Sequence, residues 1–149
     1  MAKVPAGQDA VYRGWMVGAD RYAGFVAALA ERGVVPRTGA EAHRRAHELP
    51  GWYAALAPVT PRSVWTVGDG RDAFDRARAE LGGGPAVLRD YRKSAKHHWD
   101  EAAYVPDLAD GEHAWRMASR LRELRGDDFA RGFVLREYEP FTGAEARTW

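Results

Sequence analysis

Apolar residues in the first part of the chain recur with the spacing of a helix face. One helix is predicted between Asp20, which can cap its amino end, and Gly33, which is placed to end it. Its inner positions follow the i, i+3, i+4, i+7 pattern and are Tyr22, Phe25, Val26 and Leu29. A second helix is predicted over residues 40–49, where Pro50 and Gly51 stop it.

Short runs of β-branched and aromatic residues around these helices predict strands. The runs cover residues 11–17 and 34–35. Strand, helix, strand, helix is the order of a small α/β lobe with parallel strands. We therefore predict such a lobe over residues 1–67, ended by the turn at residues 68–70.

After the turn at residues 68–70 the order of elements is less regular, as in an α+β arrangement. Apolar periodicity and apolar runs predict helices around residues 74–81 and 115–124, and strands at 64–67, 86–88, 102–105 and 133–138. Residues 68–149 are assigned to a second domain. The chain as a whole is predicted to be α/β, with α+β character in its second half.

A cluster of cations follows the predicted strand 86–88. Three glycines and Pro85 break the chain before that strand, and the cluster consists of Arg89, Arg92, Lys93, Lys96, His97 and His98. Only three of the 22 basic residues are lysines, and two of the three lie in this cluster. A lysine ammonium group is a mobile point charge that can follow a phosphate, so the cluster is a predicted anion site. On composition alone, a solvated charge run explains it equally well.

Composition limits the classes of function that remain. The formal net charge of +1 gives no overall field for drawing in nucleic acid, so any basic site must be local. The absence of cysteine excludes disulfides, thiolate catalysis and cysteine-bound zinc. No apolar run approaches the roughly 18 residues that span a bilayer, and the amino end lacks the apolar core of a signal peptide. A soluble, cytoplasmic protein without a membrane partner is expected.

Five segments, in the same order along the chain, resemble ATP-grasp proteins, and in particular the clade defined by one arginine and two lysines at the nucleotide. They are Tyr12-Arg13-Gly14-Trp15-Met16, His47-Glu48-Leu49-Pro50-Gly51-Trp52-Tyr53, Thr60-Pro61-Arg62-Ser63, the stretch from Arg89 to Ala102, and Val134-Leu135-Arg136-Glu137-Tyr138. The resemblance implies a small lobe that precedes the grasp over residues 1–67. It also implies the first half of the grasp, whose strands clamp ATP, over residues 68–149.

The resemblance implies roles for four cations. Lys93 and Lys96 would bind the α- and β-phosphates of ATP, and Arg136 would be the arginine of the clade. Arg89 stands where the clade usually has lysine. That change keeps the charge but replaces a point charge with a planar fork.

Three glutamates would hold the adenosine part of the nucleotide. The backbone of Glu137 and Glu139 would meet the adenine, and Glu145 would accept hydrogen bonds from the ribose hydroxyls. The implied activity is ligase-like. ATP would activate a carboxylate, which an amine or another nucleophile then attacks. The identity of the carboxylate substrate is not specified.

The resemblance also implies magnesium, whose acidic and asparagine ligands come from a second subdomain in the family. This chain stops at Trp149, before that subdomain. We therefore expect the metal ligands to be absent, and the chain to be a truncated and catalytically incomplete member.

Other polar residues are weaker candidates for a functional site. Arg13 lies inside a predicted strand and would pair with a structural or a substrate carboxylate. Adjacent side chains in a strand or loop point opposite ways, so one of His97 and His98 would share a face with Lys96 and contact polyphosphate or substrate. For the helical pair His43 and His47, one buried, hydrogen-bonded ring and one solvated ring are favoured over a metal site, and no metal centre is predicted.

A second class of function stays open. Six tryptophans and six tyrosines among many arginines could belong to a non-enzymatic module that binds nucleic acid by stacking, or binds protein. Most of these aromatic residues fall on predicted inner faces, where core packing accounts for them. This alternative therefore ranks second, and nucleic acid is not the expected partner.

Overall fold

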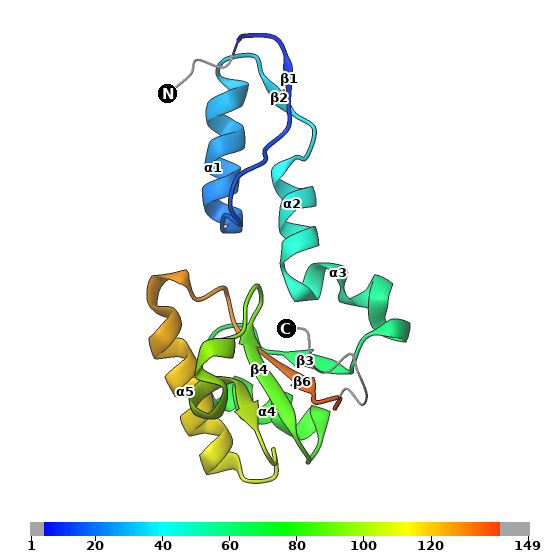
Figure 1. Ribbon diagram of the computed structural model, residues 1–149, viewed down its shortest axis with the longest axis vertical. Coiled ribbons are helices and arrows are strands. Elements are labelled where there is room, and N and C mark those ends of the chain that lie inside the picture. Colours follow the sequence, from blue (N-terminus) through cyan, green and yellow to red (C-terminus); the bar gives the residue numbers. More distant parts are fainter. Residues whose placement is uncertain (1–4, 141–149) are drawn as a thin grey trace. The chain divides into compact units, whose positions relative to one another are not determined.

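The computed structural model describes residues 5–140 of a chain that divides into two compact units, Met1–Ala54 and Ala55–Trp149 (Figure 1). Both units mix helices and strands, which confirms the predicted α/β class. None of the helices within residues 5–140 is both long enough and apolar enough to cross a membrane.

The first unit is built on one long helix. Its elements are β1 (Asp9–Ala10), α1 (Ala19–Ala30), β2 (Val35–Pro36), α2 (Ala40–His47) and most of α3 (Leu49–Leu56). The predicted helix is confirmed as α1, and its inner residues Tyr22 and Leu29 are buried. Strands β1 and β2 pair in parallel, as predicted for this lobe, but over two residues each.

The strand predicted over residues 11–17 is wrong. Strand pairing ends at Ala10 because β2, the strand that pairs with β1, is only two residues long. Beyond it, the backbone N–H and C=O groups of residues 11–17 have no neighbouring strand to bond to. The apolar side chains that follow are largely outside the core, with Trp15 93% exposed. Tyr12 instead folds back, with its ring 5.5 Å from that of Phe25 and its hydroxyl donating to the Trp15 carbonyl at 2.9 Å.

Pro50 and Gly51 lie inside a helix instead of ending one. The break comes earlier, at Glu48, whose backbone is extended, and α3 then begins at Leu49. Pro50 is tolerated there because the N–H groups of a first turn have no partner within the helix. Gly51 is needed at this corner, since a Cβ atom would lie 2.6 Å from the carbonyl oxygen of Arg45.

The second unit is an antiparallel sheet with helices packed on one face. Its strands lie in the order β3-β6-β4-β5. The main elements are β3 (Ser63–Trp65), α4 (Arg71–Leu81), β4 (Ala86–Asp90), β5 (Tyr104–Val105), α5 (Gly111–Arg125) and β6 (Phe133–Glu137). All six were predicted, with differences at their ends. Helix α5 begins at Gly111, before its first predicted inner residue, Trp115, and the first two residues predicted for β5 complete a π-helical turn, η3 (Trp99–Ala103).

Strand β3 explains why the two units divide before the predicted boundary at residue 68. Ser63 and Trp65 pair with Arg136 and Val134 of β6, so β3 is an edge strand of the second unit's sheet. The sequence places residues 63–65 in the first lobe because the turn at residues 68–70 follows them. That turn connects two elements of the same unit, β3 and α4.

Alternate residues of β4 and β6 face opposite sides of the sheet. Leu88 pairs with Leu135, and both are buried in the core formed with α4 and α5. Arg89 and Arg136, each one position further along its strand, therefore share the other face. The sheet thus separates an apolar side from a side that carries two guanidinium groups.

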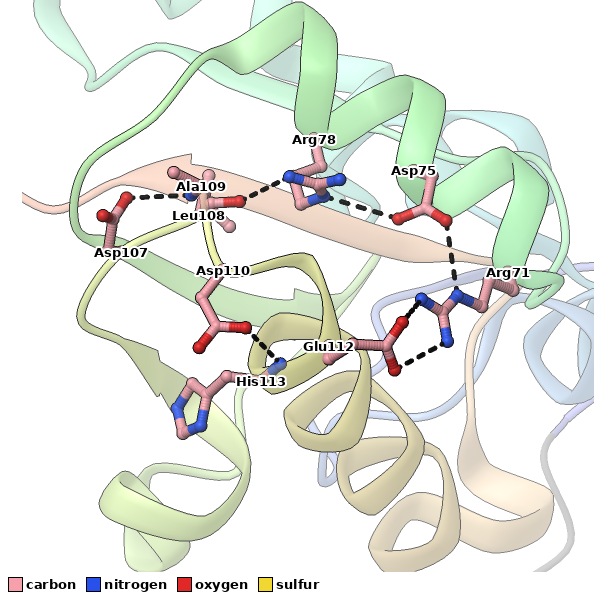
Figure 2. Close-up of polar contacts among 9 residues, drawn as sticks. All are labelled: Arg71, Asp75, Arg78, Asp107, Leu108, Ala109, Asp110, Glu112 and His113. Atoms are coloured by element: carbon pink, nitrogen blue, oxygen red, sulfur yellow. Dashed lines mark hydrogen bonds and ion pairs between the residues drawn. The ribbon is translucent and has the colours of Figure 1, made fainter.

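Polar contacts join the amino-terminal parts of α4 and α5 (Figure 2). Arg71 donates to both carboxylate oxygens of Glu112, and its Nε lies 3.3 Å from an oxygen of Asp75. Further along α4, Arg78 donates to the carbonyl of Leu108 at 2.7 Å. The hydrogen bond from Arg71 lowers the pKa of Glu112. These contacts hold both helices against the same face of the sheet.

Candidate functional site: a basic pocket at the end of β4

A pocket of about 570 Å³ opens at the carboxyl end of β4. Its walls are the end of that strand, the residues that follow it up to position 98, and the last turn of α5. None of the described residues that line it is acidic, and its cations are Arg89, Arg92, Lys93, Lys96 and Arg125. We call it the basic pocket. Several cationic donors without a carboxylate among them favour an anionic ligand.

The three arginines of the basic pocket already bind acceptors of the protein. Arg89 donates to the carbonyl of Asp90 at 3.2 Å and to that of Arg92 at 2.5 Å. Arg92 donates to the backbone carbonyl of Asp128, just after α5, at 2.5 Å. Arg125 Nε lies 2.8 Å from Asp90 Oδ2. Burial lowers the pKa of Arg89; Asp90 opposes this shift and Arg136 adds to it. The arginines therefore shape the walls of the pocket.

Lys93 and Lys96 differ from these arginines. Both side chains are exposed, both line the basic pocket, and neither ammonium group has a hydrogen-bond or ion-pair partner among residues 5–140. The two residues lie on the same short stretch after β4, three positions apart. The predicted lysine pair is thus brought together at one concave surface, with both charges available.

His97 and His98 belong to a 3-10 turn, η2 (Lys96–His98), and both line the basic pocket. The expectation that one of them would point away rested on strand-like alternation, which a 3-10 turn does not have. The Nδ1 atom of His98 also lies 3.7 Å from Glu101. His97 is exposed beside Lys96, and its role as a substrate or polyphosphate contact remains a prediction.

Arg136 is half-buried on β6, where its Nη2 donates to Thr60 Oγ1 at 2.6 Å. It shares a sheet face with Arg89 and contributes to the shift of that residue's pKa, but it is not among the residues that line the basic pocket. The structure thus brings Arg89, Lys93 and Lys96 to one pocket, with Arg136 on the adjoining face of the sheet.

The predicted adenine contacts lie at the end of β6. The backbone N–H of Glu137 donates to the carbonyl of Arg62 at 2.9 Å, and its carboxylate lies 3.8 Å from the Arg62 guanidinium. The β3–β6 ladder therefore engages this N–H group. Glu139 is exposed beyond the end of the strand, and Glu145 lies outside the described residues.

Arg13 lies in the first unit, in the segment that was wrongly predicted to be a strand. It is exposed there, so the argument that a buried charge needs a partner no longer applies. The basic pocket is lined only by residues of the second unit. Its role as a substrate contact remains a prediction.

The histidine pair of α2 forms a ring stack. His43 is buried between Tyr22 and His47, with ring centroids 3.8 and 4.1 Å away, and its Nδ1 has no partner in the described part of the chain. Burial lowers the pKa of His43, and the nearby His47 adds to the effect. Within residues 5–140, no group of three or more histidines or carboxylates could hold a metal ion.

Asp90 is the residue of this site that the sequence reasoning missed. It ends β4 on the core-facing side, after Ala86 and Leu88, and it is completely buried. A carboxylate at the third inward position of a strand is a signal in itself, because a buried charge requires partners. Its partners are Arg125 and three backbone N–H groups, one of them at Ala130.

Two solved structures show the class of fold. A RimK domain ATP-grasp protein from Sphaerobacter thermophilus is 22% identical, with a TM-score of 0.52, over 89% of this chain and 46% of its own. D-alanyl-alanine synthetase A from Vibrio cholerae is 12% identical, with a TM-score of 0.53, over 79% of this chain and 34% of its own. The fold is that of ATP-grasp proteins, and the chain spans less than half the length of either structure.

The family comparison narrows this class. Residues 80–149 match the model of an ATP-grasp domain, family 3 of the clade with one arginine and two lysines, which confirms the resemblance predicted from the sequence motifs. The matched segment contains β4, the whole basic pocket, α5 and β6. The comparison with curated proteins gave no match.

Proposed function

We propose that the second unit binds the phosphates of an adenine nucleotide through Lys93 and Lys96. The observation that carries this proposal is a pair of ammonium groups that have no partner among residues 5–140 and line a basic pocket, inside the segment that matches the ATP-grasp domain. Lys3 is the one other lysine of the chain, and the remaining basic residues are arginines. Mobile ammonium groups suit a flexible polyphosphate, whose charge they neutralise without a fixed geometry.

The same proposal assigns the remaining parts of the chain. Adenine lies against the end of β6. Glu137 meets it with its backbone carbonyl, because its backbone N–H already donates to Arg62. Glu139 meets it with its backbone groups. Arg136 reaches the nucleotide from the sheet face, and Glu145 binds the ribose. The first unit is the lobe that precedes the grasp. Arg13 and His97 are assigned to the substrate.

A ligase-like activity, in which ATP activates a carboxylate, is the reaction class that this assignment favours. Both solved neighbours carry the fold, and one is named as a synthetase. The family implies magnesium, but the described residues do not fit a metal site, since no three carboxylates or histidines gather among them. The proposal for residues 5–140 is therefore nucleotide binding, and no catalytic step is assigned to them.

A phosphate series tests this proposal. Calorimetry at low salt should give an affinity that is about tenfold higher for ADP and ATP than for AMP, because AMP lacks the β-phosphate that the second lysine would bind, and one charge-assisted hydrogen bond is worth about that much. Tripolyphosphate should compete with ATP. Equal affinity for AMP and ATP would contradict the proposal. Salt-sensitive binding of an oligonucleotide, without any response to the nucleotides, would instead support the interaction-module alternative.

A further inference from the structure

We propose that Asp90 is a positioning residue, whose buried carboxylate fixes the turn that carries Lys93 and so directs the Lys93 ammonium group into the basic pocket. This inference rests on the proposed function, because it assigns Asp90 a part in phosphate binding at the same pocket. Asp90 itself does not line the pocket and acts through its neighbour.

Three hydrogen bonds tie Asp90 to the residues that follow it. Its Oδ1 accepts from the backbone N–H of Arg92 at 2.7 Å and from that of Lys93 at 2.6 Å. Its own backbone N–H donates to the carbonyl of Lys93 at 2.9 Å. Both backbone polar groups of Lys93 therefore bind the same residue, which leaves the peptide units on either side of Lys93 little freedom to rotate.

The other carboxylate oxygen anchors this turn to the rest of the unit. Asp90 Oδ2 lies 2.8 Å from Arg125 Nε in the last turn of α5, and 3.3 Å from the backbone N–H of Ala130. Asp90 is fully buried, and the Arg125 side chain is only 18% exposed. One carboxylate thus joins strand, turn and helix at the wall of the basic pocket.

Arg89 braces the turn from the opposite side. Its guanidinium group donates to the carbonyls of Asp90 and Arg92, while the Asp90 carboxylate accepts from the N–H groups. Arg89 and Asp90 therefore bind both the carbonyl and the N–H groups of the turn. Such fixing serves binding because a lysine on an ordered backbone loses less freedom when it meets its ligand.

If Asp90 has a purely structural role, a different result is expected, and a double-mutant cycle distinguishes that role from the positioning role. If Asp90 only stabilises the fold, Lys93→Ala should weaken tripolyphosphate binding equally in the wild type and in Asp90→Asn. If Asp90 positions Lys93, we expect Lys93→Ala to cost about tenfold in the wild type but less than about threefold in Asp90→Asn, because that lysine is already misplaced. Calorimetry with tripolyphosphate provides all four affinities.

Asp69→Asn is the matched control. Asp69 also lies 2.8 Å from an arginine of α5, Arg122, but neither residue lines the basic pocket. Its loss should leave both the affinity and the effect of Lys93→Ala unchanged. If Asp69→Asn behaves like Asp90→Asn, the effect is a general loosening of α5, and the positioning role is overturned.

Hydrogen exchange gives a second readout that needs no ligand. The amides of Arg92 and Lys93 should exchange at least about tenfold faster in Asp90→Asn than in the wild type, since each donates to the lost charge. Unchanged protection would overturn the inference. If Asp90→Asn does not fold, Arg125→Gln replaces it in both measurements, because it removes the partner that holds the carboxylate. The same loss of coupling with Lys93→Ala and the same faster exchange are expected.

The outcomes distinguish this inference from the proposed function. If the wild type binds neither ATP nor tripolyphosphate, the proposed function fails, and the positioning role fails with it. If the wild type binds these ligands but the losses of affinity from Asp90→Asn and Lys93→Ala are additive, only the positioning role fails. Reduced coupling together with faster exchange of the Lys93 amide supports both.

Discussion

Replacing Lys93 and Lys96 together by alanine abolishes the binding of ATP and of tripolyphosphate and leaves the second unit folded. Both side chains are exposed and unpartnered among residues 5–140, so their removal costs the fold little. Two charge-assisted contacts are worth about 1.5–3 kcal/mol each, so the expected loss of affinity is at least about a hundredfold. Calorimetry measures the affinity, and circular dichroism checks the fold.

The control for this double variant is Arg76→Ala combined with Arg116→Ala. These arginines are exposed on α4 and α5, away from the residues that line the basic pocket, and the control loses the same two positive charges. It should bind ATP like the wild type. Equal weakening in both double variants would mean that overall charge, not the lysine pair, attracts the ligand, and undiminished binding in the lysine variant would refute the site.

Phe133→Ala destabilises the second unit by about 3–5 kcal/mol, the usual cost of deleting a buried phenylalanine ring. Phe133 is fully buried at the start of β6, and its ring packs against those of Phe74, Trp115 and Phe129, with centroids 5.0 to 6.1 Å away. Deleting it leaves a cavity between the sheet and both helices. Urea unfolding, followed by near-ultraviolet circular dichroism, measures the change in the free energy of unfolding.

Phe25→Ala is the matched control for the core variant. The same ring is deleted, but Phe25 lies on α1 of the first unit and is 39% exposed. The second unit should therefore unfold at an unchanged urea concentration. A loss below about 1 kcal/mol for Phe133→Ala would show that the sheet does not pack on α4 and α5 as described.

The elements of the second unit could be predicted because local and tertiary preferences agree there. Phe74, Ala77 and Leu81 have helical spacing and all face the core, and β6 has an apolar run that is buried in the middle of the sheet. In the first unit, the run at 11–17 has strand propensity but no neighbour long enough to pair with. Propensity alone cannot supply a partner strand.

The candidate site was predictable in part for a chemical reason. Lysine is scarce in this chain, so two lysines in one stretch stood out, and the structure places both at one pocket. The hydrogen-bond partners of Arg89 could not be predicted from the fact that it is an arginine. Its position in the family pattern suggests a ligand contact, whereas its guanidinium group binds two backbone carbonyls of the adjoining turn. The network around Asp90 joins residues up to 40 positions apart, which no local pattern reveals.

The scarcity of lysine also provides the most direct test of the central claim. Selective isotope labelling of lysine side chains gives three ammonium signals, from Lys3, Lys93 and Lys96. Lys93→Arg and Lys96→Arg assign two of them. On addition of tripolyphosphate or ATP, we expect the signals of Lys93 and Lys96 to shift together and saturate at one ligand per chain, while the Lys3 signal stays in place. Signals that do not move, or three that move alike without saturation, would contradict the account.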